Sequence, residues 1–175
     1  MIVLGLSGAL THDPSAALIV DGQLVSAVEE ERFLRDKHAK RRWPLHAARY
    51  CLEAAGVDAT DVDAVAFPFA PFGFGYPGRW HFARRYWYAP DRALNVLFNG
   101  NRLYRRNRRA ILDLMRQVGM APSRTPFLPV AHHLAHASSA YHLSGFSGKT
   151  AILGIDGKGE YATTFFGYGE NGRIH

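Results

Sequence analysis

The 175-residue sequence has a single cysteine, so it cannot form a disulfide within the chain. It also lacks an apolar run approaching the ~20 residues that span a bilayer, and its first residues, MIVLGLSGALTHD, lack the basic region of a signal peptide. These absences favour a cytoplasmic chain with no membrane partner. Hydrophobic residues (47%) and charged residues (21%) occur in ordinary globular proportions, which argues against disorder. We interpret the one thiol, Cys51, as core filler rather than as a nucleophile.

Lysine is missing from residues 79–124, although this segment holds 11 arginines and only two acids. The segment therefore carries a net charge of +9, and the other residues sum to −3 within the total of +6. Of the 22 aromatic residues, 12 fall between Phe67 and Tyr104. One interpretation is a helical insert whose arginines lie over apolar surface. Another is a surface that recognises phosphate or carboxylate. Nucleic acid is a disfavoured partner because no known RNA-binding motif accompanies the arginines.

The order of elements predicts an α/β fold. Three strands open the chain, at 2–7, 15–20 and 23–29, with Asp21-Gly22 as a hairpin turn. A helix from Pro44 to about Ala55 follows and ends at Gly56. The later predicted elements are a strand at 61–67, a loop at 68–78, a helix at 101–118, a strand at 125–130, a helix at 131–143, strands at 150–156 and 161–168, and a turn at 169–172. The two hairpins resemble equivalent starts of duplicated lobes. We therefore expect one lobe over 1–147, with a helical insert at about 69–124, and the truncated start of a second lobe over 148–175.

The sharpest chemical signal is the sequence His132-His133-Leu134-Ala135-His136. His132 and His136 are four residues apart, so a helix places them on one face, where two imidazoles can bind one metal ion. His133 lies about 100° around the same helix. Asp156 is the best third ligand, because it follows a predicted buried strand and precedes glycines. Such a set suits iron, zinc or manganese. The alternative is a pair of hydrogen-bonded histidines on a surface helix.

Two glycine-rich connections are candidate phosphate-binding loops, because small residues let backbone N–H groups approach an anion. The residues expected to contact phosphate are Ser7, Gly8, Gly157 and Gly159. His12, in the first loop, is our candidate general base. Lys37 could meet a phosphate or carbamoyl group, although a solvated charge run is the simpler interpretation of its surroundings.

Three blocks of sequence together resemble one family. They are GLSGALTHDPSAALIVDGQLVSAVEEERFLRDKHAKRRWP, HHLAHASSAY and IDGKGEYATT. Their order and spacing are similar to those of the O-carbamoyltransferases of the nodulation-protein and antibiotic-tailoring type. The N-terminal part of that family is similar to the tRNA threonylcarbamoyl-transfer proteins. The resemblance covers residues 1–56 and 126–175, and Lys158 departs from the small apolar residue expected in the third block.

The resemblance implies an actin-like ATPase (ribonuclease H-like) fold. It implies a carbamoyltransferase that moves a carbamoyl group from carbamoyl-adenylate to an acceptor hydroxyl. A C-terminal domain would make the adenylate from carbamoyl phosphate and ATP, so these 175 residues alone are expected to be inactive. The family's metal ligands fall on His132, His136 and Asp156, with Fe²⁺ expected and Zn²⁺ or Mn²⁺ as alternatives. The competing hypothesis is a non-catalytic nucleotide- or RNA-binding module of the same fold.

Overall fold

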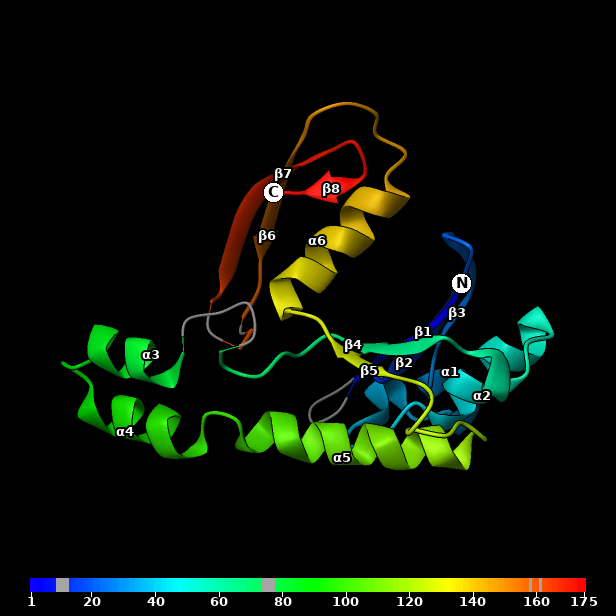
Figure 1. Ribbon diagram of the computed structural model, residues 1–175, viewed down its shortest axis with the longest axis horizontal. Coiled ribbons are helices and arrows are strands. Elements are labelled where there is room, and N and C mark those ends of the chain that lie inside the picture. Colours follow the sequence, from blue (N-terminus) through cyan, green and yellow to red (C-terminus); the bar gives the residue numbers. More distant parts are fainter. Residues whose placement is uncertain (9–12, 74–77, 158, 161) are drawn as a thin grey trace. The chain divides into compact units, whose positions relative to one another are not determined.

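The computed structural model describes residues 1–8, 13–73, 78–157, 159–160 and 162–175, which form two compact units (Figure 1). Unit 1 comprises Met1–Phe67 and Leu103–Leu128, and unit 2 comprises Pro68–Arg102 and Pro129–His175. The division places the helix after residue 131 with the strands that follow it, whereas the predicted lobe boundary lies at 147/148. That boundary concerns a duplication, and it stays a prediction.

A five-stranded sheet lies in unit 1. Its strands are β1 (Ile2–Ser7), β2 (Ser15–Val20), β3 (Gln23–Glu29), β4 (Ala64–Phe67) and β5 (Phe127–Pro129), in the order β3-β2-β1-β4-β5. The first three strands are antiparallel and have the predicted bounds, whereas β4 runs parallel to β1. Alternate residues such as Leu4, Leu6 and Leu18 are fully buried, as the twofold repeat of a strand requires. Asp21 and Gly22 both have positive φ, which confirms the predicted two-residue turn.

The helical elements of this part of the chain are α1 (Glu31–Leu34), η1 (Lys37–Ala39), α2 (Leu45–Ala55), η2 (Ala59–Asp61) and α5 (Arg102–Gln117). Helix α2 packs on β2 and β3 and buries Cys51, as expected of core filler. It ends at Gly56, whose φ of 62° is the left-handed cap that glycine allows. Helix α5 confirms the helix predicted at 101–118 and buries Ile111, Leu114 and Met115. Its arginines are exposed.

Unit 2 contains α3 (Arg79–Arg85), α4 (Pro90–Asn99), α6 (His132–Leu143), β6 (Thr150–Ile155), β7 (Thr164–Glu170) and β8 (Arg173–Ile174). The strands form an antiparallel sheet in the order β6-β7-β8, against which α6 packs. The strand predicted at 161–168 and the turn predicted at 169–172 were misplaced. Pairing of Thr150 with Gly169 extends β7 to Glu170, and the turn is Asn171-Gly172, where both residues have positive φ.

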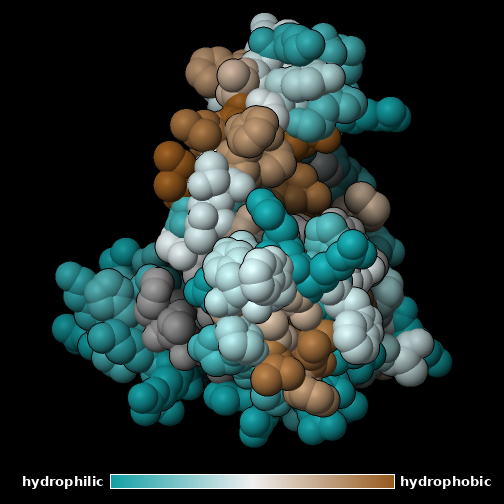
Figure 2. Space-filling model, turned by 90° about the vertical axis from the view of Figure 1, so that its left-hand side faces the viewer, coloured by the Kyte–Doolittle hydropathy of each residue, from teal (hydrophilic) through white to brown (hydrophobic). Residues whose placement is uncertain are grey.

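The outer face of β6 and β7 is apolar. Leu153, Ile155 and Phe166 are 69%, 77% and 84% exposed. Figure 2 shows hydrophobic atoms gathered on the upper part of its face, where these strands lie. Helices α3 and α4 pack on each other. Trp80 and Phe98 on these helices and Trp87 between them are exposed. None of the helices in the described ranges is both long enough and apolar enough to cross a membrane.

Candidate metal centre

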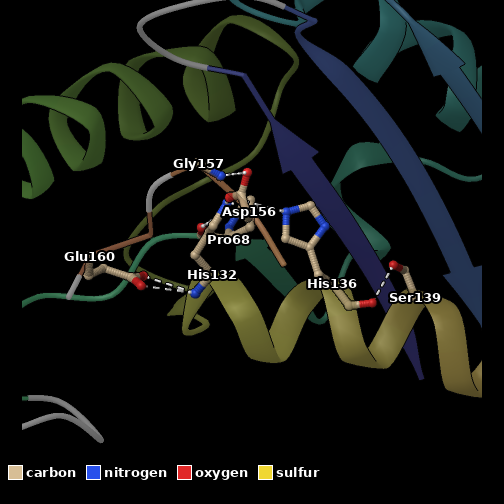
Figure 3. Close-up of polar contacts among 7 residues, drawn as sticks. All are labelled: Pro68, His132, His136, Ser139, Asp156, Gly157 and Glu160. Carbon is tan, nitrogen blue, oxygen red and sulfur yellow. Dashed lines mark hydrogen bonds and ion pairs between the residues drawn. The ribbon is translucent and has the colours of Figure 1, made fainter. Parts of the chain in front are cut away.

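The site lies where helix α6 begins and strand β6 ends, both in unit 2. His132 is the first residue of α6, and His136 follows one turn later on the same face. Asp156 comes directly after β6, and its backbone N–H donates to the Thr163 carbonyl at 2.9 Å. A helix and a strand end thus bring the three predicted ligands together (Figure 3).

The three donor atoms lie close to the separations that one bound ion would require. His132 Nε2 lies 2.8 Å from Asp156 Oδ2 and 3.2 Å from His136 Nε2, and His136 Nε2 lies 3.9 Å from Asp156 Oδ2. Ligand bonds of ~2.0–2.2 Å place neighbouring ligand atoms about 3.0–3.5 Å apart. Two imidazoles and one carboxylate are a donor set of non-haem iron and zinc sites, with further positions open. The residues present therefore fit a divalent transition-metal ion.

Exposure differs across the three side chains. That of His132 is 16% exposed, that of Asp156 35% and that of His136 57%. One ligand is thus anchored inside unit 2, and the other two border solvent. A substrate atom could reach an ion held here from the His136 side.

Contacts outside the group orient the ligands. The Pro68 carbonyl lies 3.2 Å from Nδ1 of His132, and the Phe69 ring stacks on the imidazole with centroids 4.7 Å apart. The Pro68 carbonyl can accept a proton on Nδ1, which would let the Nε2 lone pair bind a metal ion in place of the Nε2–H bond to Asp156. The Gly157 N–H donates to the other carboxylate oxygen, Asp156 Oδ1, at 2.6 Å.

The carboxylate of Asp156 is held in its ionised form. The hydrogen bond from His132 lowers the pKa of this carboxyl below its ordinary value, and the Gly157 N–H lowers it further. Because metal ions bind carboxylate rather than carboxylic acid, Asp156 is ready to act as a ligand throughout the neutral range.

The predicted phosphate contacts lie in both units, and their role stays a prediction. Ser7 ends β1, and Gly8 follows it with a φ of 81°; a Cβ there would lie 2.2 Å from the Pro14 Cα, so only glycine fits. The N–H of Gly157 is bonded to Asp156, and the N–H of Gly159 donates to the Ala162 carbonyl at 3.0 Å. A phosphate would have to replace these two bonds.

The other predicted residues are less informative. Lys37 begins η1 in unit 1 and is exposed. The candidate base His12 and the variant residue Lys158 fall outside the described residues.

Sequence reasoning missed three residues that support the site. Pro68 and Phe69 belong to the loop after β4, more than 60 residues before His132, and nothing in their local sequence signals the contact. Glu160 accepts the backbone N–H of His132. It ends the motif Asp156-Gly157-Lys158-Gly159-Glu160, so a search for acids near the predicted ligands could have found it.

Among the described residues, a second group of ligand-type side chains lies in unit 1. Asp13, Glu31 and His38 each offer one donor atom, and the three atoms lie within 4.8 Å of one another. His38 Nδ1 is 2.9 Å from Asp13 Oδ1, and Glu31 Oε2 accepts the His38 backbone N–H at 2.8 Å.

The chain is similar to known proteins over nearly its whole length. The family model described as "Carbamoyltransferase N-terminus" matches residues 2–175. The chain is 32% identical to nodulation protein NolNO of Sinorhizobium fredii over 99% of its length and 26% of that protein. It is 33% identical to the uncharacterized protein sll1178 of Synechocystis sp., over 98% of the chain and 28% of that protein. The chain thus spans about a quarter of the length of these relatives.

Among solved structures, YeaZ from Pseudomonas aeruginosa superposes with a TM-score of 0.52 at 20% identity. The superposition covers 99% of this chain and 63% of that one. It confirms the predicted actin-like, ribonuclease H-like fold and carries no further argument.

Proposed function

Because the chain belongs to the carbamoyltransferase N-terminus family, we propose that it takes part in moving a carbamoyl group onto a hydroxyl of an acceptor molecule. The observation that carries this proposal is the family match over nearly the whole chain, from residue 2 to residue 175. The curated relative NolNO, named as a nodulation protein, supports it at 32% identity. The proposed acceptors are sugars and other hydroxyl compounds.

The proposed donor is carbamoyl-adenylate, made from carbamoyl phosphate and ATP. In the transfer, a C–O bond forms between the acceptor oxygen and the carbamoyl carbon. The bond between that carbon and the phosphate oxygen breaks, AMP leaves, and the hydroxyl proton passes to a base. His12 is our candidate for this base. Because the adenylate is already activated, the acceptor oxygen needs orientation more than it needs a strong base.

We propose that His132, His136 and Asp156 hold a divalent ion for this reaction, with Fe²⁺ as the first candidate and Zn²⁺ or Mn²⁺ as alternatives. When bound, such an ion supplies positive charge that stabilises negative charge developing on a carbamoyl or phosphate oxygen. The support is the convergence of Nε2, Nε2 and Oδ2 on one point, with the Pro68 carbonyl fixing the His132 ring. The exposed His136 side of the group leaves room for substrate.

The test is a transfer assay with the protein at its full natural length, radiolabelled carbamoyl phosphate, ATP and a panel of sugars and polyols. We expect ATP-dependent movement of label into a neutral product. His132→Ala and His136→Ala should abolish it. His142→Ala is the matched control, because this exposed histidine lies on the same helix outside the group. A protein that consumes no carbamoyl phosphate in the presence of ATP would contradict the proposal.

A further inference from the structure

Glu160 joins three segments of unit 2. Its Oε1 accepts the backbone N–H of Ala70 at 2.7 Å and that of His132 at 3.0 Å. Its Oε2 lies 3.2 Å from the same His132 nitrogen. One carboxylate thus connects the loop after β4, the first residue of α6 and the β6–β7 connection, as Figure 3 shows for the bonds to His132.

The carboxylate of Glu160 lies at the N-terminus of helix α6, where a negative charge is favourable. The first turn of a helix presents unpaired N–H groups and a partial positive charge, so helix N-termini favour anions and disfavour cations. Here His132, a candidate ligand for a cation, is itself the first residue of α6. The preceding residue, Ala131, has no side chain that could cap the helix. Glu160 supplies the missing cap from another segment, and its negative charge opposes the helix dipole beside the proposed ion.

The same carboxylate also fixes the ring of His132 indirectly. Pro68 accepts from the imidazole and Phe69 stacks on it, and both precede Ala70, whose N–H is bound by Glu160. Glu160 therefore holds the backbone of the ligand and the segment that orients its side chain.

Close packing brings Glu160 within reach of α6. A Cβ on Gly159 would lie 2.6 Å from the ring of His133, which is 3% exposed. Only glycine at position 159 lets the β6–β7 connection approach the helix this closely. The buried His133 ring thus acts as the surface on which this connection rests.

We propose that Glu160 is a positioning residue of the metal centre, which caps α6 and holds His132 and the Pro68–Ala70 segment in the geometry that binds the ion. This inference rests on the proposed metal site. It adds a residue that contacts neither the ion nor the substrate and yet sets the affinity for the ion.

The experiment titrates the purified metal-free protein with Co²⁺, whose visible absorption reports the coordination geometry. Glu160→Gln keeps the shape and one oxygen but removes the charge, and Glu160→Ala removes both. We expect Glu160→Gln to weaken Co²⁺ binding by about tenfold, Glu160→Ala to weaken it more, and both to change the spectrum. Glu170→Gln, at the end of β7 and outside the site, should match wild type in affinity and spectrum.

A second variant tests the inference with the carboxylate intact. Gly159→Ala should displace Glu160 from α6 and weaken Co²⁺ binding, with circular dichroism confirming that each variant is folded. Wild-type affinity and spectrum in folded Glu160→Gln and Gly159→Ala would overturn the inference and leave the metal centre standing. If wild type itself binds no Co²⁺, Fe²⁺ or Zn²⁺, the metal centre and the inference both fail, whereas the carbamoyl-transfer assay still tests the family activity separately.

Discussion

Each unit of the molecule gathers three ligand-type side chains within 4.8 Å of one another, but the two groups are held differently. In unit 1, the members bind one another's backbone: Glu31 accepts the His38 N–H at 2.8 Å, and the Asp13 N–H donates to the His38 carbonyl at 2.9 Å. In unit 2, the ligand backbones are held from outside the group, by Glu160 and Thr163. The hydrogen bonds in unit 1 hold the backbone at Asp13 and His38 together, whereas those in unit 2 direct the donor atoms at a common point.

In each unit, a glutamate from another segment caps a helix. We expect the two caps to serve different purposes. Glu30 Oε2 accepts the Ala47 N–H at 2.8 Å at the start of α2, and Oε1 lies 2.6 Å from His46 Nδ1. Glu30 is 1% exposed, and the helix that it caps, α2, carries none of the candidate metal ligands. Removing the cap should therefore cost fold stability in unit 1 and ion affinity in unit 2.

The largest expected effect separates the two groups directly. His132→Ala and His136→Ala each remove a ligand and should weaken Co²⁺ binding by at least about 100-fold, since loss of an outer contact alone costs about 10–100-fold. His38→Ala should leave the affinity within about twofold of wild type and lower the melting temperature, because its imidazole contributes to a structural clasp. Isothermal titration and thermal melts measure the two effects. Weakened Co²⁺ binding in His38→Ala, with the unit 2 variants unaffected, would reverse the comparison.

A pH series sharpens the account of unit 2. The carboxyl of Asp156 has a lowered pKa, caused first by its bond from His132, so its charge is lost only at pH values below the usual carboxyl range near ~3.9. From pH 7 to pH 5, Asp156 should therefore stay ionised and contribute no proton to the competition with Co²⁺. Isothermal titration in buffers of different ionisation enthalpy measures the protons released on binding. Release of more than two protons would show that Asp156 titrates as well.

The next effect tests the cap in unit 1. Glu30→Ala leaves the buried Ala47 N–H and the start of α2 without their acceptor and should destabilise the fold by about 2 kcal/mol. The free energy of unfolding from urea titration measures it, with the exposed Glu53→Ala on the same helix as control. Co²⁺ affinity should be unchanged in the folded protein. A cost below about 0.5 kcal/mol would place Glu30 among ordinary surface acids.

Much of the fold could be predicted from sequence because its signals are local. Alternating apolar residues and the Asp21-Gly22 turn define the first hairpin, and Gly56 ends α2 as expected. The bounds of β7 were misplaced, since they depend on pairing with β6 across the sheet. Asparagine tolerates positive φ in turns, as Asn171 shows, but the four-residue turn predicted at 169–172 did not single out Asn171-Gly172 as the turn residues.

The candidate site divides in the same way. The fourfold spacing of His132 and His136 is a property of one helix, and Asp156 follows a recognisable strand, so all three ligands could be predicted. The residues that hold them divide. Pro68 reaches His132 only after a loop distant in sequence has packed, and no local pattern encodes that contact. Glu160 lies in the same motif as Asp156, so a search for acids near the predicted ligands could have found it.

The smallest expected effect concerns a feature that both units share. Asn107 on α5 and His133 on α6 are buried, and within the described ranges none of their side-chain nitrogens or oxygens has a hydrogen-bond partner. Burial of an unpaired amide costs free energy that an apolar side chain of similar size avoids. Asn107→Leu should therefore stabilise the fold by about 1 kcal/mol in urea unfolding, while the exposed Asn99→Leu should change it by less than about 0.5 kcal/mol.

We expect His133→Leu to act differently from Asn107→Leu. The ring of His133 fills the space against Gly159, so His133→Leu changes the surface on which the β6–β7 connection rests. It should weaken Co²⁺ binding through Glu160, even if the free energy of unfolding rises.

Destabilisation of more than 1 kcal/mol by Asn107→Leu would show that its amide has a partner in solution, such as a buried water. Asn107 and His133 would then differ in their hydrogen bonding as well as in the structure that they support.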